Sequence, residues 1–496
     1  MEEEQAVASD SDVVGSDSNV AGSGRNRASL TGGWRDPVPL PRELERPVDV
    51  QQILRSDTVP PAETLLHASD YDLGTEPLDA SRYYSREFHD KEVASVWSKA
   101  WQCAVWSHDI PRPGDISVYD IVDRSVILVR QTDMSVKAFV NSCLHRGRKL
   151  CDQAVRRNQL RCPYHGFTWG LDGALNWVPA EWDFPQIEPA TFGLPEVRVD
   201  EWNGFFFVNF DEDAPPLREY MGAMYDQWGG ESPRGAWDFS SKYKAVHLYR
   251  EMNCNWKVGM EGFIEALHVW ASHPQIAQMN PESSCQYDVY PDEPHFSRFH
   301  ALMGLPSHNF RVQPSDQEVV DTFTASYVPE HNGTEFGKLR EGETARQAFA
   351  RISKDVFSKR LNMDVSKLAD AELIDGTEYL LFPNILPWPS IVVPLFYRFR
   401  PKGNDPDWCI WETMLFMPFE GERPPSCEIT YVEQGKSFED YGKMGALDKI
   451  LQQDAEQLPL VQQGLKASAT QKVELARYQE ARIRHYHQTI DSYINR

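Results

Sequence analysis

Two short loops within residues 141–173 constrain this chain of 496 residues more than any other feature. Cys143 and His145 are separated by one residue, and Cys162 and His165 by two, in the sequence NSCLHRGRKLCDQAVRRNQLRCPYHGFTWGLDG. Each loop therefore offers one thiolate and one imidazole. Thiolates and neutral imidazoles are ligands that transition metals take from proteins. We predict that the two loops converge on one metal centre.

Two kinds of metal site fit this ligand set. A structural zinc ion takes two Cys and two His as a tetrahedron, whereas a Rieske [2Fe–2S] cluster has two His in place of two Cys on one iron. Cys143 and His145 are closer in sequence than structural zinc pairs usually are, which favours a loop whose ligands reach two different irons. We assign Cys143 and Cys162 to one iron and His145 and His165 to the other. Zinc stays open as the alternative.

The same loops resemble those of a known family, the large (alpha) subunits of Rieske non-heme iron oxygenases, also called aromatic-ring-hydroxylating oxygenases. Cys-x-His-Arg-Gly at 143–147 and Cys-Pro-Tyr-His-Gly at 162–166 are similar to the two cluster loops of that family. Respiratory-type Rieske proteins usually carry an additional Cys in each loop. Neither loop does so here, because Cys151 lies beyond the first loop. The resemblance covers residues 79–496.

A second group of metal-binding residue types lies in 255–274, NWKVGMEGFIEALHVWASHP. At about 100° per residue, one side of a helix here is apolar, which predicts an amphipathic helix packed by that side. The apolar positions are Trp256, Met260, Phe263 and Leu267. The opposite side carries Glu261, Glu265 and His268. An ordinary surface helix would place these polar residues in water, and periodicity alone leaves that alternative open.

His273 follows His268 by five residues and precedes Pro274. A residue before proline is disfavoured in the α region, so we expect the helix to end there and His273 to turn toward His268. Two His and one carboxylate form a facial triad with open positions, which suits a non-heme Fe(II) that reacts with oxygen. The sequence thus offers part of a second metal site.

Glu265-x2-His268-x4-His273 resembles the acidic-x2-His-x4-His motif of the same family. The resemblance implies that His268 and His273 are ligands of a mononuclear iron. It implies that Glu265 is not a ligand and instead bridges a ligand His and a cluster His of the neighbouring subunit. Many members have Asp at this position, and the usual Glu-Asn pair upstream is Glu261-Gly262 here.

The resemblance places the third iron ligand on a helix near the C-terminus. The segment 451–467, LQQDAEQLPLVQQGLKA, is similar to that helix, and we select Asp454. Asp448 and Glu456 are the alternative ligands, and a solvated acidic helix start is the alternative without a metal. Pro459 removes one helical hydrogen bond and could shift the register.

The composition narrows the class of protein. A formal net charge of −24 opposes a general role in binding nucleic acid. The longest apolar runs, such as 204–210 and 391–397, are far shorter than the ~20 residues that cross a bilayer. The first two dozen residues carry six acidic residues, no basic residue and no apolar signal region. We expect a cytoplasmic protein that binds neither membrane nor nucleic acid.

The cysteines outside the two loops show no disulfide spacing, so we expect reduced core residues. They are Cys103, Cys151, Cys254, Cys285, Cys409 and Cys427. Around the loops themselves, basic residues outnumber the single acid Asp152, and they would suit an acidic ferredoxin or simply form a solvated face. They are Arg146, Arg148, Lys149, Arg156, Arg157 and Arg161.

The predicted fold class is α+β. We expect a disordered or extended N-terminal tail over 1–78, a small antiparallel-β Rieske [2Fe–2S] domain over 79–195, and a catalytic mononuclear iron domain over 196–496 in which helices cover a curved antiparallel sheet. Local patterns predict helices at 85–101 and 473–494. They predict strands at 116–122, 125–130, 136–140 and 204–210, and a pocket floor built from 380–400 and 408–418.

The resemblance also implies a reaction. Electrons from NAD(P)H pass through a ferredoxin or reductase to the cluster and then to the mononuclear Fe(II) of an adjacent subunit, where O2 oxidises an apolar, aromatic or polycyclic substrate by cis-dihydroxylation or monooxygenation. It implies a homotrimer, or an assembly with a small beta subunit. The alternatives are a monooxygenase or demethylase of quaternary ammonium or methylated substrates, an electron carrier without its own catalysis, and a zinc-stabilised binding module.

Overall fold

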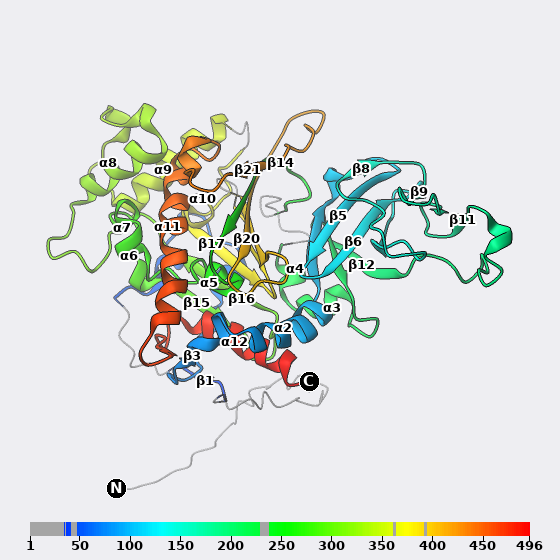
Figure 1. Cartoon of the computed structure of the whole chain (residues 1–496). Helices are drawn as coiled ribbons and strands as arrows, with labels where there is room; N and C mark the ends of the chain where they lie inside the picture. The colour runs from blue at the N-terminus through cyan, green and yellow to red at the C-terminus, as the bar shows by residue number, and fades with distance from the viewer. Residues whose placement is uncertain (1–33, 35, 41–46, 229–237, 361–363, 391–393) are drawn as a thin grey trace, which may run out of the picture.

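The computed structural model describes residues 34, 36–40, 47–228, 238–360, 364–390 and 394–496. Within them the chain forms a β domain that projects to one side of a larger body in which helices surround a second sheet (Figure 1). The two β-rich parts and the helices around the second sheet confirm the α+β class. Most of the tail that we expect to be disordered, 1–35, lies outside the described residues.

The segment 47–78 differs from the disordered or extended tail expected over 1–78. It forms α1 (Val50–Arg55), whose cap Asp49 accepts a hydrogen bond from Gln52 N, and the 3-10 helix η1 (Glu63–Leu66). Leu54 and Leu65 are buried in the main core. This segment has too few apolar residues to give a periodic signal. They are nevertheless buried, because they pack against the larger body.

One pair of short strands forms within the N-terminal region, and a second pair attaches its end to the C-terminal part of the chain. The strand β1 pairs with β2, and β3 pairs with β22 near the C-terminus. Their bounds are β1 (Val38–Pro39), β2 (Tyr71–Asp72), β3 (Leu78–Asp79) and β22 (Lys472–Val473).

The projecting domain is an antiparallel sheet of seven strands in the order β4-β13-β12-β7-β6-β5-β8, with a three-stranded sheet, β11-β10-β9, at its far end. The bounds are β4 (Gln102–Trp106), β5 (Asp115–Ile121), β6 (Arg124–Arg130), β7 (Val136–Val140), β8 (Val155–Arg156), β9 (Leu160–Arg161), β10 (Thr168–Trp169), β11 (Leu175–Trp177), β12 (Glu196–Trp202) and β13 (Phe205–Asn209). These bounds match the predicted strands closely. The sheet nevertheless continues through β12 and β13, past the expected boundary at 195, because both strands pair inside it.

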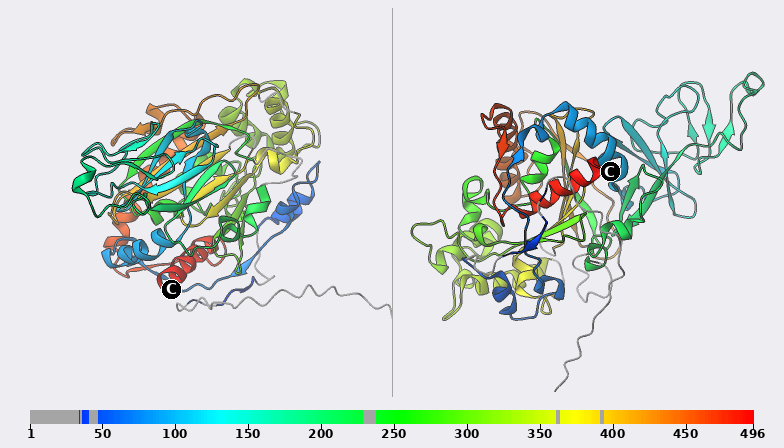
Figure 2. Two further views of the ribbon diagram at one scale, coloured as in Figure 1. Left: turned by 90° about the vertical axis from the view of Figure 1, so that its right-hand side faces the viewer. Right: turned by 90° about the horizontal axis from the view of Figure 1, so that it is seen from below.

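The larger body contains an eight-stranded sheet in the order β15-β16-β17-β18-β19-β20-β14-β21, antiparallel except for the β14/β21 pair. Its strands are β14 (Tyr243–Met252), β15 (Gln286–Val289), β16 (Phe296–Ala301), β17 (Gly376–Leu381), β18 (Ile385–Trp388), β19 (Leu395–Pro401), β20 (Cys409–Met417) and β21 (Thr430–Val432). Two further views show most of the helices around this sheet, with the projecting domain extending to one side (Figure 2).

The helices of the two parts are α2 (Arg86–Lys99), α3 (Leu217–Met221), α4 (Met224–Trp228), α5 (Trp256–Glu261), α6 (Val269–Ser272), α7 (Pro274–Ala277), α8 (Asp316–Tyr327), α9 (Ala345–Arg360), α10 (Asp370–Ile374), α11 (Ala446–Ala467) and α12 (Ala481–Ile494). Short 3-10 helices complete the chain: η2 (Ala80–Tyr83), η3 (Ser107–Asp109), η4 (Glu181–Asp183), η5 (Glu282–Ser284), η6 (Pro329–His331), η7 (Glu335–Gly337) and η8 (Phe438–Asp440). The last helix begins later than the predicted 473.

The single helix predicted for 255–274 is two helices. α5 ends at Glu261 and α6 begins at Val269, with Gly262 as the cap of α5. Glycine is unfavourable within a helix. After Gly262, the backbone N–H of Ala266 donates to the Tyr287 hydroxyl at 3.0 Å instead of to a helical carbonyl. The break leaves Leu267 38% exposed instead of packed in the apolar stripe.

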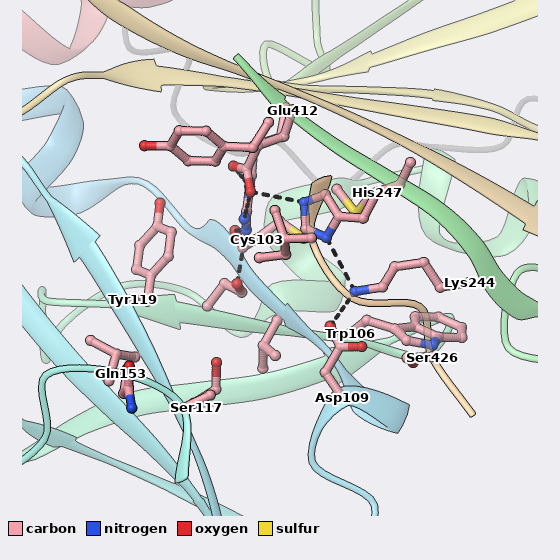
Figure 3. Close-up of a pocket in the computed structure, with 18 of the residues that line it drawn as sticks. Cys103, Trp106, Asp109, Ser117, Tyr119, Gln153, Lys244, His247, Glu412 and Ser426 are labelled. Atoms are coloured by element: carbon pink, nitrogen blue, oxygen red, sulfur yellow. Dashed lines mark hydrogen bonds and ion pairs between the residues drawn. The ribbon is translucent and has the colours of Figure 1, made fainter. Parts of the chain in front are cut away.

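A buried ionic network joins the two parts of the protein. Arg398 on β19 donates to two backbone carbonyls of β4 at 2.8 Å and binds Glu412 of β20 through two bonds of 2.7 and 2.8 Å. The network runs from Glu412 to His247, Lys244 and Asp109, beside a hollow of about 1710 Å³ between the two sheets (Figure 3). Burial raises the pKa of Glu412, but the nearby guanidinium groups outweigh it and hold that pKa well below its usual range.

Candidate metal centres

The two Cys/His loops have the same backbone turn. Gly147 N donates to Cys143 O at 2.9 Å, and Gly166 N donates to Cys162 O at 3.0 Å. Both glycines have positive φ, 75° and 87°. A side chain is strained in this conformation, which explains why a Gly ends each motif. The two loops therefore present their Cys and His in equivalent positions.

The four predicted residues of these loops converge at the far end of the projecting domain. The rings of His145 and His165 lie 4.7 Å apart at 72°, and Cys143 and Cys162 are both buried free thiols. His145 Nδ1 is buried without a hydrogen-bond partner among the described residues. Burial lowers the pKa of His145 and raises that of Cys143. A neutral imidazole with an unpaired buried nitrogen beside two thiols is a donor set that fits a Rieske cluster.

The basic residues around these loops are partly neutralised. Arg148 pairs with Asp152 at 2.6 Å, Lys149 with Asp120 at 2.9 Å, and Arg156 approaches Asp115 at 3.9 Å. The rim also exposes aromatic side chains, including Tyr164 at 59% and Trp182 at 83%. The local positive charge is therefore smaller than the sequence indicates.

In the larger body, His268, His273 and Asp454 lie together. One potential ligand atom from each lies within 4.8 Å of the others, and His273 Nε2 is 2.9 Å and His268 Nε2 3.9 Å from Asp454 Oδ1. His273 has left the helical region, with φ −126° and ψ 60°, as predicted from Pro274. The helix α11 continues through Pro459, so the proline does not interrupt it.

The two alternative acids on α11 lie outside this group. Asp448 accepts a hydrogen bond from Met444 N at 3.0 Å near the start of the helix. Glu456 is exposed and accepts one from Gln452 at 2.8 Å. Of the three candidate carboxylates, the structure brings Asp454 to the two histidines.

Each histidine of this group has a partner on its other ring nitrogen. His268 Nδ1 lies 2.5 Å from Glu265 Oε1, and His273 Nδ1 lies 2.9 Å from Gln453 Oε1. These contacts leave both Nε2 atoms directed toward Asp454. Metal-binding histidines characteristically donate their second N–H to such an acceptor. Sequence reasoning did not identify the role of Gln453, although its position beside Asp454 is a signal that could have done so.

Electrostatics favour a cation between these groups. Burial lowers the pKa of His268, but the carboxylates of Glu265 and Asp454 outweigh it and raise the pKa to about 9. Glu265 is only 8% exposed, which excludes the alternative of an ordinary surface helix with this residue in water. Two imidazoles and one carboxylate, with a second carboxylate behind His268, match the donor set of a non-heme iron site.

A cavity of about 390 Å³ adjoins the three residues. Its wall is mainly apolar, and its aromatic members are Phe263, Phe299, Phe323, Tyr327, Phe357, Trp388 and Tyr397. The predicted pocket floor is half correct. Segment 380–400 contributes Trp388, Leu395 and Tyr397, whereas 408–418 contributes none and instead borders the hollow between the sheets.

The chain matches two protein-family models. The model for the ring hydroxylating alpha subunit (catalytic domain) matches residues 239–496, and the model for the Rieske [2Fe–2S] domain matches 100–188. The chain belongs to the ring-hydroxylating alpha subunit family. A Rieske cluster and a mononuclear iron are the cofactors of this pair of domains, and the two donor sets above fit them.

Curated relatives in the family differ in what they act on. The carnitine monooxygenase oxygenase subunit of Acinetobacter baumannii is 25% identical over 209 residues, which cover 42% of this chain and 54% of that protein. The large oxygenase component of the naphthalene 1,2-dioxygenase system of Pseudomonas putida is 33% identical over 202 residues, 38% of this chain and 42% of that protein. The chain thus spans about half the length of the curated relatives it matches.

Solved structures share the fold over most of the chain. A quaternary ammonium Rieske monooxygenase in complex with γ-butyrobetaine superposes with a TM-score of 0.58 at 15% identity, covering 84% of this chain and 95% of that one. A naphthalene 1,2-dioxygenase variant bound to phenanthrene gives 0.59 at 18% identity, covering 86% and 93%. Among the described helices, none combines the length and apolar character that crossing a membrane requires.

Proposed function

We propose that this chain is the oxygenase component of a Rieske oxygenase system. Cys143 and Cys162 hold one iron of the cluster, and His145 and His165 hold the other. A mononuclear iron binds to the three residues His268, His273 and Asp454. The observation that carries the proposal is the convergence of these last three side chains on the wall of an apolar cavity.

The bound cofactors would supply single electrons from the cluster and oxygen activation at the mononuclear iron. The residues of the chain orient the groups around this chemistry. Glu265 and Gln453 hold the Nδ1 side of the two imidazoles, so that both Nε2 atoms face Asp454. The aromatic wall of the cavity excludes water and orients an apolar substrate beside these atoms.

Glu265 has a second role in the proposal, as the bridge to a cluster His of the neighbouring subunit. Its carboxylate already binds His268 Nδ1 and His268 N. The proposed assembly is a homotrimer, alone or with a small beta subunit, which receives electrons originating from NAD(P)H through a ferredoxin or reductase. The large oxygenase components among the relatives belong to systems of several components, which supports such a donor.

The proposed substrate class is aromatic or polycyclic, in a cytoplasmic catabolic reaction that adds one or both atoms of O2. The aromatic wall supports this class. A monooxygenase or demethylase of a quaternary ammonium compound is the second candidate, favoured by the fold shared with such an enzyme and by an aromatic wall that could contact a cation.

Iron and sulfide analysis, followed by a turnover assay, tests the proposal. We expect three irons and two acid-labile sulfides per chain, and incorporation of labelled oxygen from O2 into a polycyclic substrate. His268→Ala should retain the cluster spectrum and lose one iron and all product. Two irons per parent chain would instead indicate an electron carrier, and a colourless zinc protein would indicate a binding module.

A further inference from the structure

The cavity beside the proposed iron site contains two polar groups that the proposed reaction does not use. Asn280 and Ser353 line the cavity and are buried, at 3% and 1% exposed. Asn280 Oδ1 and Ser353 Oγ each lack a hydrogen-bond partner within the described parts of the chain. A buried polar atom without a partner is costly, and in a ligand cavity it is most simply satisfied by the ligand.

The hydrogen bond of the Asn280 amide nitrogen sets the orientation of this side chain. Its Nδ2 donates to Leu302 O at 2.7 Å, so exchanging the oxygen and nitrogen would bring two acceptors together. The remaining atom, Oδ1, can only accept a hydrogen bond. The group of the ligand that meets it must therefore be a donor.

Ser353 lies on α9 and lines the same cavity. Arg346, about two turns earlier on that helix, donates to Met303 O at 3.2 Å, and Asn280 binds the carbonyl of the preceding residue, Leu302. The helix α9 and Asn280 therefore both contact the segment that follows β16. A serine in a helix usually satisfies its hydroxyl on an earlier carbonyl, but no such bond is present here. This hydroxyl can donate or accept.

Charged side chains in the described cavity wall are already paired or belong to the proposed iron site. Asp375 binds Arg346 at 2.6 Å, and Arg360 binds Glu330 at 2.6 Å. Glu265 binds the ligand imidazole. The wall therefore offers a charged substrate no free counter-ion, and burying an unpaired charge is strongly unfavourable.

We propose that the substrate is a neutral polycyclic compound carrying a hydroxyl or N–H group that donates to Asn280 Oδ1, with Ser353 Oγ as a second polar contact in the cavity. This inference rests on the proposed function and narrows its substrate class. It excludes a bare hydrocarbon, which would leave the Asn280 oxygen buried without a donor, and a quaternary ammonium ion, which has no N–H. The cavity volume of about 390 Å³ is sufficient for a ring system of this kind.

Binding measurements without turnover test the proposal. Anaerobic holoenzyme is titrated with three probes that share one ring system: phenanthrene, phenanthrol and a trimethylammonium derivative of phenanthrene. We expect phenanthrol to bind about tenfold more tightly than either of the others, the effect of satisfying a buried polar atom. Equal affinities for phenanthrol and phenanthrene, tighter binding of the cation, or no binding of any probe would overturn the inference.

Variants locate the effect. Asn280→Leu and Ser353→Ala should bring the ratio of phenanthrol to phenanthrene affinity close to one, mainly by weakening phenanthrol. Asn384→Leu is the matched control, because Asn384 also donates through Nδ2 to a carbonyl, Phe399 O at 2.7 Å, and also has a buried Oδ1 without a partner. It does not line the cavity. The proposal is contradicted if the affinity ratio of phenanthrol to phenanthrene stays unchanged in Asn280→Leu and Ser353→Ala. It is also contradicted if Asn384→Leu lowers this ratio as much as they do.

Failure of the proposed function would be recognised separately. If phenanthrol binds with the expected ratio but the chain holds only two irons and incorporates no labelled oxygen, the oxygenase function is wrong and the polar recognition site stands. If the holoenzyme oxidises phenanthrene and phenanthrol alike and binds them equally, the oxygenase stands and the recognition site is wrong.

Discussion

The two proposed metal centres are assembled in different ways. Cys143, His145, Cys162 and His165 come from two neighbouring loops of one small domain, and each loop closes by its own turn at a glycine. His268 and His273 come from the ends of one short helix, whereas Asp454 comes from α11, far along the chain. The cluster site is therefore local, and the mononuclear site depends on the packing of the larger body. Changes in that packing should affect the second centre and spare the first.

The largest expected effect comes from removing the distant carboxylate. Asp454→Asn should lose one iron per chain and all turnover while the cluster absorption remains, because Asn cannot supply a negatively charged ligand to the histidines. Metal analysis and visible spectroscopy on the same sample check this. Asp448→Asn and Glu456→Gln are the controls and should retain all iron. If a control variant lost iron while Asp454→Asn kept all of it, the residue changed in that control would be the third iron ligand instead of Asp454.

The junction between the two regions tests whether they are stabilised together. Glu412→Gln leaves the buried Arg398 without its anionic partner and should lower the free energy of unfolding by about 3–5 kcal/mol at pH 7. The folded pKa of Glu412 is depressed, so its contribution is complete above the unfolded pKa of about 4.3 and is lost as pH falls through the folded pKa. Urea unfolding should show the difference between parent and variant shrinking below that pH. A constant difference would contradict the assignment.

Glu265→Gln tests the connection between the two centres. The variant should keep both metals, because Glu265 contacts the far side of His268, but should slow electron transfer from cluster to mononuclear iron by about 10–100-fold. Rapid-mixing absorption of the reduced enzyme measures that rate. Glu261→Gln, at a partly buried glutamate whose partners are Tyr83 and His487, is the control. Normal transfer in Glu265→Gln, or full activity in a strictly monomeric enzyme, would rule out the bridge.

Gln453 supports the other histidine and should have a smaller role. Gln453→Met keeps the approximate volume but removes the acceptor of His273 Nδ1, so we expect iron affinity to fall by about tenfold with the cluster unchanged. Competition with a chelator measures the affinity. If Gln453→Met releases iron no faster than the parent, the contact does not orient the ligand.

The smallest effect is expected at the rim of the cluster. Arg156→Glu with Arg157→Glu should slow cluster reduction by a ferredoxin a few-fold at low salt and leave reduction by dithionite unchanged, since steering by charge is screened by ions. The effect should be modest because acids already neutralise several nearby bases. Lys338→Glu with Arg340→Glu, on the exposed surface of the larger body, is the control. Equal reduction rates at every salt concentration would exclude docking at this rim.

Local signals were enough for the central strands of the projecting domain. Its strands alternate or form short buried runs bounded by turn residues, and the predicted positions lie close to β5, β6 and β7. Periodicity failed in 255–274, because it treats a helix as continuous. Gly262 ends α5, and Ala266 N donates its hydrogen bond to the Tyr287 hydroxyl instead of to a helical carbonyl. This contact joins residues 21 positions apart, so helical periodicity could not predict it.

The donor types, the two cluster loops and the helix end at His273 could all be predicted from the amino-acid sequence, since each depends on residues within a few positions of one another. The packed fold was needed to choose Asp454 over Asp448 and Glu456 as the carboxylate beside the two histidines. It was also needed to find that Gln453 contacts His273 and that Asn280 and Ser353 line one cavity. These depend on which faces of α9 and α11, and of the turn after α7, pack inward, and packing between distant segments leaves no short-range pattern in the chain.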